Sequence, residues 1–574
     1  MIARKLFFIL LMGWMLVAPA ATPTPNLPNM GGVILREAER STGKHEMAPA
    51  PLVPAEQPPA EAPLPQQAGQ TVFVTSFRIK ATRFSEEELL KVLKDYVGRA
   101  LTMAELQEAA RKLGDYYHQH DFLAHAFLPP QTVRKGVVEI TVVEGRLGEV
   151  QVDPSSTTRL DHKFAASLVQ SRAGINQGNQ SLHPSALDEA VMILNEVPGV
   201  HATSTLAPGA NESESIAVLK IEDGPMLGGS LTLDRAGSHS TGADRALTSV
   251  SLSDPLGHGE QFSAVNLLTS GSTYARLGAV VPVGISGLTL GVNGSALGYT
   301  VGGTLTPLDL NGFAWTLGLT AGYPIVRTSN FSLTGSATFD YKRMVDWGNH
   351  AMLDEKRIQV GTFGLSAMVK DDWMGGGTNR LGATLSLGHL DLSNQPTSLA
   401  ADQAAGRTNG TYGKLVFTAA REQPLIDKLT LSTNFQAQIS HPNLDSSEQF
   451  SLGGQEGIRA YPPSEAGGDG GWMTNLELQW QATETAKLFT FYDIGGIQQH
   501  NQPWTNWQTV PNQPNSYTLQ GAGIGATWTL SPSLQVKAML AHTIGNNPGQ
   551  NREGNDSDGN HHQIRGWAQA VFSF

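Results

Sequence analysis

The sequence predicts a transmembrane β-barrel of about 16 antiparallel strands, preceded by two α+β modules of the order β-α-α-β-β. Three observations carry this prediction. The first residues have the pattern of a secretory signal. A segment rich in charged residues shows the same order of helices and strands twice, and the last 349 residues alternate between apolar and polar side chains. Only 16% of the 574 residues are charged, against about 25% in an ordinary soluble protein.

Residues 1–20 have the parts of a signal peptide. Arg4 and Lys5 precede an apolar stretch, and Ala18 and Ala20 supply the small residues that signal peptidase accepts. The apolar stretch falls short of the ~20 residues that span a membrane as a helix, so a retained anchor is the weaker alternative. We therefore expect the mature chain to leave the cytoplasm, either as a soluble secreted protein or as a membrane β-barrel.

Residues 21–70 are predicted to be a proline-rich linker that contains one helix. Ten prolines lie in this range, a composition typical of extended chain. Residues 32–43 lack proline and consist of helix-favouring residues, few of which are strongly apolar. Such a helix suits a wet cavity better than a dry core, and a solvated segment without fixed structure is the alternative. The candidate contact residues of this helix are Ile34, Leu35, Arg36 and Glu39.

Residues 71–146 form the first predicted module. They hold 21 charged residues among 76, the proportion of a soluble domain. A strand is expected over 72–79, Ser85 and Thr102 each begin a capping pattern for a helix, and two further strands follow. The same order of elements returns in residues 147–225, which form the second predicted module.

Residues 226–574 are predicted to form the barrel. The 120 residues 226–345 contain only 12 charged side chains. In the segment 429–440, apolar residues such as Leu431 and Phe435 share one face, and polar residues such as Gln436 share the other. About sixteen such segments follow one another, and a barrel of that size encloses water and leaves room for a solute or an extended polypeptide. A two-layer sandwich or a propeller also alternates in this way and is the alternative.

The chain ends as outer-membrane barrels commonly do. In its last segment Phe572 and Phe574 lie on the apolar face, and the final residue is aromatic.

Two short motifs precede this end. The first is Ile458-Arg459-Ala460-Tyr461, in a long segment between two predicted strands. The second is Asp493, on a strand where it shares the expected lumen face with Phe491. A carboxylate there accepts two parallel hydrogen bonds from an arginine fork, which would fix a long loop inside a wet cavity. Taken without other information, the two charges are better interpreted as separate and solvated.

Two such modules followed by a barrel of this size resemble the outer-membrane transporters of two-partner secretion, the haemolysin secretion/activation class. The resemblance implies that 71–146 and 147–225 are POTRA (polypeptide-transport-associated) domains in the periplasm, that 32–43 is a plug helix, and that 442–471 is a loop in the lumen. In that class the loop tip carries a Val-Arg-Gly-Tyr-type motif whose Arg is held by an Asp of the thirteenth strand. The corresponding residues here are 458–461 and Asp493, with Ala460 in place of a glycine that favours positive φ.

The function implied by the resemblance is export of one dedicated large partner protein, an adhesin, cytolysin or toxin, from the periplasm to the cell surface. The implied partners are the secreted polypeptide, captured by the POTRA domains, outer-membrane lipid, and the barrel-assembly machinery during biogenesis. The alternative from the same superfamily is a machine that assembles or inserts outer-membrane proteins.

The sequence contains few signs of other functions. No phosphate-binding Gly-Lys-Ser/Thr motif or catalytic Ser/His/Asp order occurs, and there is no cysteine. His561 and His562 lie near two aspartates, in a segment that we interpret as a hydrated loop. A net charge of −12 argues against nucleic acid as a partner. We expect no catalytic residue, cofactor or metal site.

Overall fold

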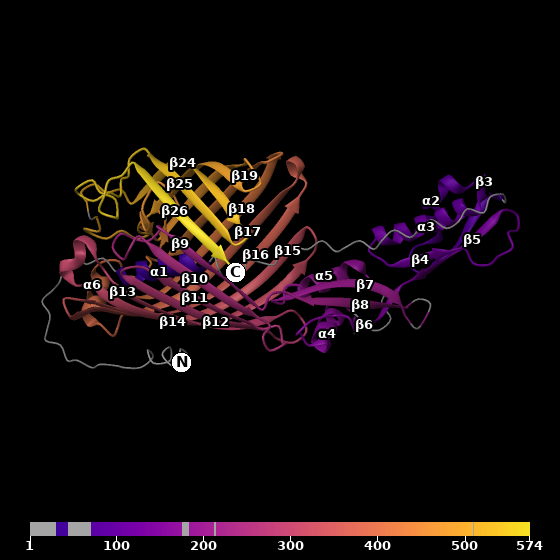
Figure 1. The fold of residues 1–574 in the computed structure, drawn as a ribbon, viewed down its shortest axis with the longest axis horizontal. Coiled ribbons are helices and arrows are strands. Elements are labelled where there is room, and N and C mark those ends of the chain that lie inside the picture. The colour runs from indigo at the N-terminus through magenta and orange to yellow at the C-terminus, as the bar shows by residue number, and fades with distance from the viewer. Residues whose placement is uncertain (1–29, 44–70, 175–182, 210, 212–213, 509) are drawn as a thin grey trace.

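The computed structural model describes residues 30–43, 71–174 and 183–574, apart from 210, 212–213 and 509. The expected signal peptide and most of the expected linker lie outside the described residues. Figure 1 shows two small α+β domains in line with one end of a large barrel, and a helix inside the barrel. Among the described residues, no helix is both long and apolar enough to cross a membrane.

The first α+β domain has five strands where the predicted order has three. Its elements are β1 (Thr71–Val74), β2 (Ser76–Lys80), α2 (Glu86–Val92), η1 (Lys94–Tyr96), β3 (Arg99–Thr102), α3 (Met103–Gln119), β4 (Ala124–Phe127) and β5 (Val137–Glu144). The single strand expected over 72–79 is wrong, because Thr75 separates β1, which pairs with β3, from β2, which pairs with β5. Four residues are too few for β3 to show a period in the sequence.

The second domain repeats the arrangement of the first. It consists of β6 (Arg146–Val152), α4 (His162–Arg172), α5 (Pro184–Leu194), β7 (Val200–Pro208) and β8 (Glu214–Asp223). Its sheet order β6-β8-β7 matches the order β2-β5-β4, with a parallel pair and then an antiparallel pair in both. The Asp161 side chain caps α4 by accepting the N–H of Phe164 at 3.1 Å and that of Lys163 at 2.6 Å, and these bonds lower the pKa of the carboxyl.

Sixteen antiparallel strands close the barrel, which confirms the predicted fold class. They are β9 (Leu227–Asp234), β10 (Arg245–Ser253), β11 (Gln261–Leu268), β12 (Ser272–Pro282), β13 (Thr289–Thr300), β14 (Asn311–Arg327), β15 (Phe331–Gly348), β16 (Ala351–Asp371), β17 (Gly377–Asp391), β18 (Gly410–Ile426), β19 (Leu429–His441), β22 (Gly470–Gln481), β23 (Ala486–Gln498), β24 (Ser516–Ser531), β25 (Leu534–Ile544) and β26 (Ile564–Ser573). β26 pairs with β9 and completes the ring, so neither a sandwich nor a propeller is present.

The barrel wall has an apolar outer face and a largely polar inner face. Outward side chains such as Phe363 and Ile439 are 58% and 61% exposed, whereas Gln438, next to Ile439, points inward and is buried. Phe572 and Phe574, at the end of β26, are on the exposed outer face. This is the pattern that a wall between lipid and a wet lumen requires.

The strand connections differ between the two barrel ends. Short turns face the α+β domains, one of them with η4 (Trp373–Gly375), and longer loops lie at the far end (Figure 1). The far loops include η3 (Gly303–Leu308), α6 (Pro396–Ala404) and the segment with β20 (Phe450–Ser451) and β21 (Gly467–Gly468). Helix α1 (Met30–Gly43) lies inside the barrel, in the half away from the α+β domains.

Candidate functional site: the occupied lumen

The connection between β19 and β22, residues 442–469, folds back into the barrel. The sequence placed this loop at 442–471, and β22 takes its last two residues. Side chains from the loop and from five barrel strands, β22 to β26, form one buried apolar cluster inside the wall, which includes Leu452, Ile458 and Phe489. A loop packed in this way is fixed to the inner wall rather than suspended in water.

The Arg459 guanidinium is held by the Asp493 carboxylate. Arg459 Nε lies 2.9 Å from Asp493 Oδ2 and Nη2 lies 2.8 Å from Oδ1, the bidentate geometry of an arginine fork. The Arg459 backbone N–H donates a third hydrogen bond to the same carboxylate, at 3.0 Å. Phe491 completes the site, because Arg459 Cζ stands 3.5 Å from the centre of its ring. Both charged side chains are nearly inaccessible to solvent.

Three further residues of this site were missed by the sequence reasoning. Glu477 accepts from Arg459 Nη1 at 2.5 Å, and Asn475 donates to Asp493 at 2.9 Å. Trp567, on β26, donates its indole N–H to the Arg459 carbonyl at 2.8 Å. Asn475 pairs directly with Asp493 across β22 and β23, so the strand register, once known, would have identified it.

The rest of the tip motif is buried, and Ala460 needs no glycine at its position. Ile458, Ala460 and Tyr461 are each at most 1% exposed, and Ala460 is not among the described residues with positive φ. Space for its methyl group comes from the wall, because a Cβ on Gly521 would stand 2.5 Å from the Ala460 Cβ. Gly521 lies beside Asp493 in the register of β23 and β24. The glycine that this packing requires is therefore on the barrel and not in the loop.

Helix α1 fills another part of the lumen. Ile34, Leu35 and Ala38 are buried in an apolar cluster with inward side chains of the wall, among them Leu267, Tyr274 and Tyr299. The helix starts at Met30, two residues before the predicted start, and its two glycines bring it close to its neighbours. A Cβ on Gly31 would stand 2.3 Å from Asp346 Oδ1, and one on Gly32 would stand 2.4 Å from Ser446 Oγ.

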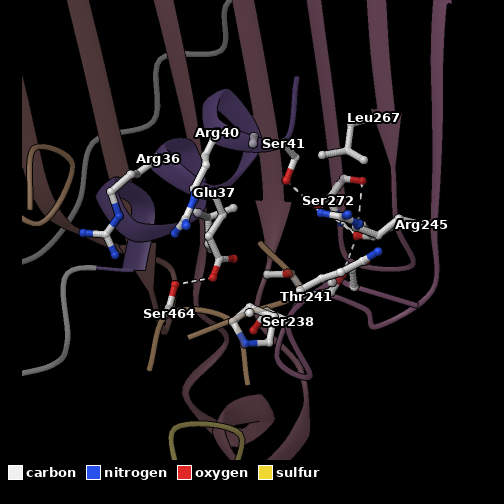
Figure 2. Close-up of a pocket in the computed structure, with 18 of the residues that line it drawn as sticks. Arg36, Glu37, Arg40, Ser41, Ser238, Thr241, Arg245, Leu267, Ser272 and Ser464 are labelled. Carbon is white, nitrogen blue, oxygen red and sulfur yellow. Dashed lines mark hydrogen bonds between the residues drawn. The ribbon is translucent and has the colours of Figure 1, made fainter. Parts of the chain in front are cut away.

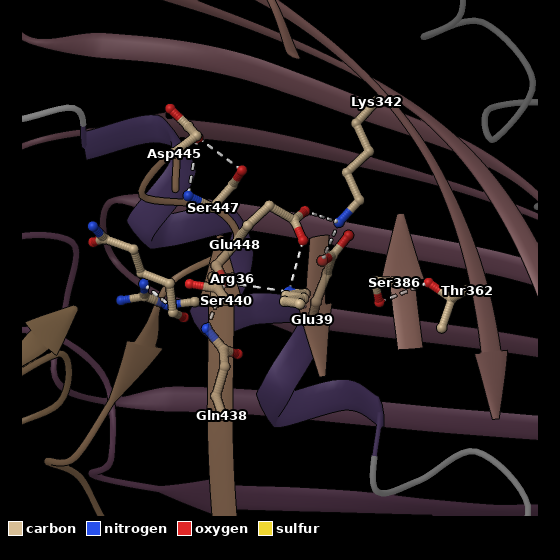
Figure 3. Close-up of polar contacts among 12 residues, drawn as sticks. Arg36, Glu39, Lys342, Thr362, Ser386, Gln438, Ser440, Asp445, Ser447 and Glu448 are labelled. Carbon is tan, nitrogen blue, oxygen red and sulfur yellow. Dashed lines mark hydrogen bonds and ion pairs between the residues drawn. The ribbon is translucent and has the colours of Figure 1, made fainter. Parts of the chain in front are cut away.

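The polar side of α1 is bonded to both the wall and the loop (Figure 3). Arg36 donates to the carbonyls of Ser446 and Gln449, at 2.7 and 3.1 Å. Lys342 of β15 lies 3.1 Å from Glu39 and 3.4 Å from Glu448 of the loop, so one ammonium group joins helix, loop and wall.

A small cavity separates the other polar side of α1 from the wall (Figure 2). Across it, Ser464 of the loop donates to Glu37, and Arg245 of β10 donates to Ser41 at 2.7 Å. Arg40 reaches the Ser451 hydroxyl at 3.3 Å. Most contacts at this side of the helix are therefore polar.

A larger cavity, of about 780 Å³, lies between the loop tip and the second α+β domain. Arg459 and Glu477 line it from the barrel, and Glu196, in the connection after α5, lines it from the domain. Hydroxyl and amide side chains form the largest group among the other lining residues, including Thr334, Thr418, Ser432, Asn434, Gln436 and Gln479, and apolar and charged residues make up the rest. As far as the described residues go, the lumen contains a cavity on the side of the α+β domains and is occupied by loop and helix beyond.

Two tandem domains of this topology and a sixteen-stranded barrel with a loop in its lumen define a transporter of the POTRA-plus-barrel superfamily. Residues 213–528, more than half of the chain, match the haemolysin secretion/activation protein ShlB/FhaC/HecB family, and residues 73–145 match the POTRA domain of ShlB type. The chain belongs to this family of two-partner secretion transporters, and its place is the outer membrane.

Curated relatives agree with this assignment. The chain is 25% identical over 476 residues to the heme/hemopexin transporter protein HuxB of Haemophilus influenzae strain 86-028NP, covering 80% of this chain and 81% of the relative. It is 22% identical over 467 residues to the outer membrane transporter CdiB of Escherichia coli O6:K15:H31, covering 78% and 75%.

Solved structures share the fold. CdiB from Escherichia coli superposes with a TM-score of 0.66 at 17% identity, over 96% of this chain and all of that one. BamA from Haemophilus ducreyi, lacking its POTRA domains 1–3, reaches a TM-score of 0.51 at 14% identity, over 88% and 100%.

Proposed function

We propose that this transporter exports one dedicated large partner protein, an adhesin, cytolysin or toxin, from the periplasm to the cell surface. The observation that carries the proposal is the asymmetry of the lumen. Its periplasmic half contains a cavity of about 780 Å³ that begins at the second POTRA domain, and its far half is filled by α1 and the loop. An unfolded chain passing through such a cavity meets many hydroxyl and amide groups, which can hydrogen-bond to its backbone in turn.

The second POTRA domain offers an edge for capturing the partner. Strand β7 is the outer strand of the sheet β6-β8-β7, and at nine residues it is longer than the four-residue edge strand β4 of the first domain. An extended segment of the partner would add to this edge through backbone hydrogen bonds. Since Arg327 of β14 pairs with Glu196 just before β7, the edge is held close to the lumen entrance.

Passage of the partner requires α1 to leave the lumen. The 27 residues from 44 to 70 reach roughly 90 Å when fully extended, so the helix would leave the pore without losing its attachment to the chain. No nucleotide drives this step in our proposal, and the barrel performs no catalysis. Folding of the partner outside the cell would make its return unfavourable.

The second candidate function, assembly or insertion of outer-membrane proteins, shares its fold with this one, as the likeness to BamA illustrates. The supernatant and outer-membrane proteomes of strains with and without the gene separate the two. We expect the loss of one or two very large secreted proteins with other barrels unchanged. A broad fall in many barrels would establish the assembly function instead.

A further inference from the structure

The lipid-facing wall of the barrel contains an apolar groove of about 540 Å³. Its floor lies on β14 and β15, where Ala321 pairs with Ala337 and Gly335 pairs with Tyr323. Large side chains stand beside this floor, namely Leu288 on one side and Phe363 and Leu365 of β16 on the other. Small residues between tall apolar neighbours make a channel in the outer surface about one side chain deep.

The groove opens toward lipid in the periplasmic half of the wall. Its floor residues have the same parity as Leu317 and Leu319 of β14, which are 54% and 59% exposed on the outer face. Tyr323 lies a few residues before Arg327, where β14 ends at the POTRA side. At this depth the wall faces the acyl chains of the periplasmic leaflet, because the apolar band of such barrels is about 25 Å tall.

Polar groups stand at the periplasmic end of the groove. Arg172, at the end of α4 in the second POTRA domain, donates from Nη1 to the Tyr323 hydroxyl at 3.0 Å. Because that hydroxyl accepts from Arg172, its own proton is free to be donated to an acceptor. Arg172 also forms an ion pair with Glu189.

We propose that this groove binds one acyl chain of a glycerophospholipid of the periplasmic leaflet, with the lipid phosphate at Tyr323 and Arg172. An acyl chain that fills the channel contacts its apolar walls closely along its length. Such close-packed contacts are more favourable than the loose contacts of lipid chains that pass over an unfilled groove. A phosphate oxygen would accept the Tyr323 proton and face the guanidinium. The bound lipid would then touch both the barrel and the second POTRA domain, and add to the contact between them.

The test uses the full-length protein in mild detergent, titrated with phosphatidylglycerol and observed by native mass spectrometry. Ala337→Leu fills the floor of the groove, and Ala279→Leu makes the same change at an outward position of β12 that does not line it. We expect Ala337→Leu to weaken lipid binding by about tenfold, the effect of displacing about two methylene groups, and Ala279→Leu to leave it unchanged. Equal binding by both variants, or an equal loss in both, would overturn the proposal.

Two further variants keep the test decisive. Tyr323→Phe removes the proton donor, so it should weaken binding of phosphatidylglycerol but not of a diacylglycerol with the same chains. Equal effects on both lipids would show that Tyr323 does not bind the phosphate. If Ala337→Leu fails to show the heat-dependent electrophoretic shift of a folded barrel, Ala383→Leu, which narrows the same groove from β17, takes its place with the same expectation.

Discussion

The loop tip and the plug helix both occupy the lumen, but they are held in different ways. At the tip, Ile458 and Tyr461 are buried in an apolar cluster, and Arg459 satisfies a carboxylate that is itself fully buried. Helix α1 has a short apolar face, and its other contacts are polar pairs spread along the helix, such as the one between Glu39 and Lys342. Dry, close packing around a bidentate pair is costly to open, whereas isolated polar contacts exchange readily for water.

This difference suggests that the loop is part of the wall and that the helix is the removable stopper. The two meet at Glu448 of the loop, which Lys342 joins to Glu39 and which Lys414 also contacts at 2.7 Å. When α1 leaves, Glu448 keeps two lysine partners, so this junction between the loop and the wall remains. The predictions below test this division of roles, beginning with the largest expected effect.

Replacing Asp493 by Ala should loosen the loop most. It leaves the Arg459 guanidinium buried with only Glu477 as a charged partner, and breaking a buried pair costs about 3–5 kcal/mol. We expect a lower unfolding temperature by heat-dependent electrophoretic mobility, and less secreted partner. Asp427→Ala, at an exposed position in the turn between β18 and β19, is the matched control. Normal secretion together with normal barrel stability in Asp493→Ala would count heavily against the role given to the loop.

Arg459→Lys should have a smaller effect of the same kind. Lysine keeps the charge but has no planar fork, so at least one hydrogen bond to Asp493 is lost, at a cost of about 2 kcal/mol. The unfolding temperature should fall between those of the wild type and Asp493→Ala. A variant as stable as the wild type would show that charge alone holds the tip.

Lys342→Met should release the helix and leave the loop in place. It removes the cation shared by Glu39 and Glu448, and losing one charge-assisted bond to α1 corresponds to about a tenfold rise in the open fraction. Single-channel conductance in planar bilayers measures this fraction. Lys370→Met, at an exposed position near the periplasmic end of β16, should leave the conductance unchanged. An unfolding temperature as low as that of Asp493→Ala would instead mean that Lys342 supports the loop.

Outside the barrel, the cap of α4 should respond to pH. Hydrogen bonds from the α4 backbone lower the pKa of Asp161, so its stabilisation is complete above the unfolded pKa and is lost as pH falls below about 4. Hydrogen exchange of the α4 amides should speed up there, and Asp161→Ala should speed it up about fivefold at neutral pH. If the α4 amides exchange at the same rate at low pH and in Asp161→Ala, the Asp161 cap does not stabilise α4.

The sequence predicts the strands of the barrel wall better than the contacts of the loop and helix inside it. Alternation with period two depends only on neighbouring residues, and it sufficed to assign faces to Phe435 and Asp493. The partners Asn475 and Glu477 depend on the register between strands, and the space for Ala460 depends on Gly521 of another strand. Lys342 and Glu39 are about three hundred positions apart in the chain, so no local pattern pairs them.

The central claim is that α1 leaves the lumen during export while the loop tip stays, and cysteine labelling tests it directly. The chain has no cysteine, and Thr42 of α1 and Ile458 of the tip are both buried, at 1% and 0% exposure. Thr42→Cys and Ile458→Cys variants would be treated with a hydrophilic maleimide in cells with and without the partner. We predict that the partner increases labelling at position 42 and leaves position 458 protected. Labelling that rises together at both positions, or at 458 alone, would contradict the account.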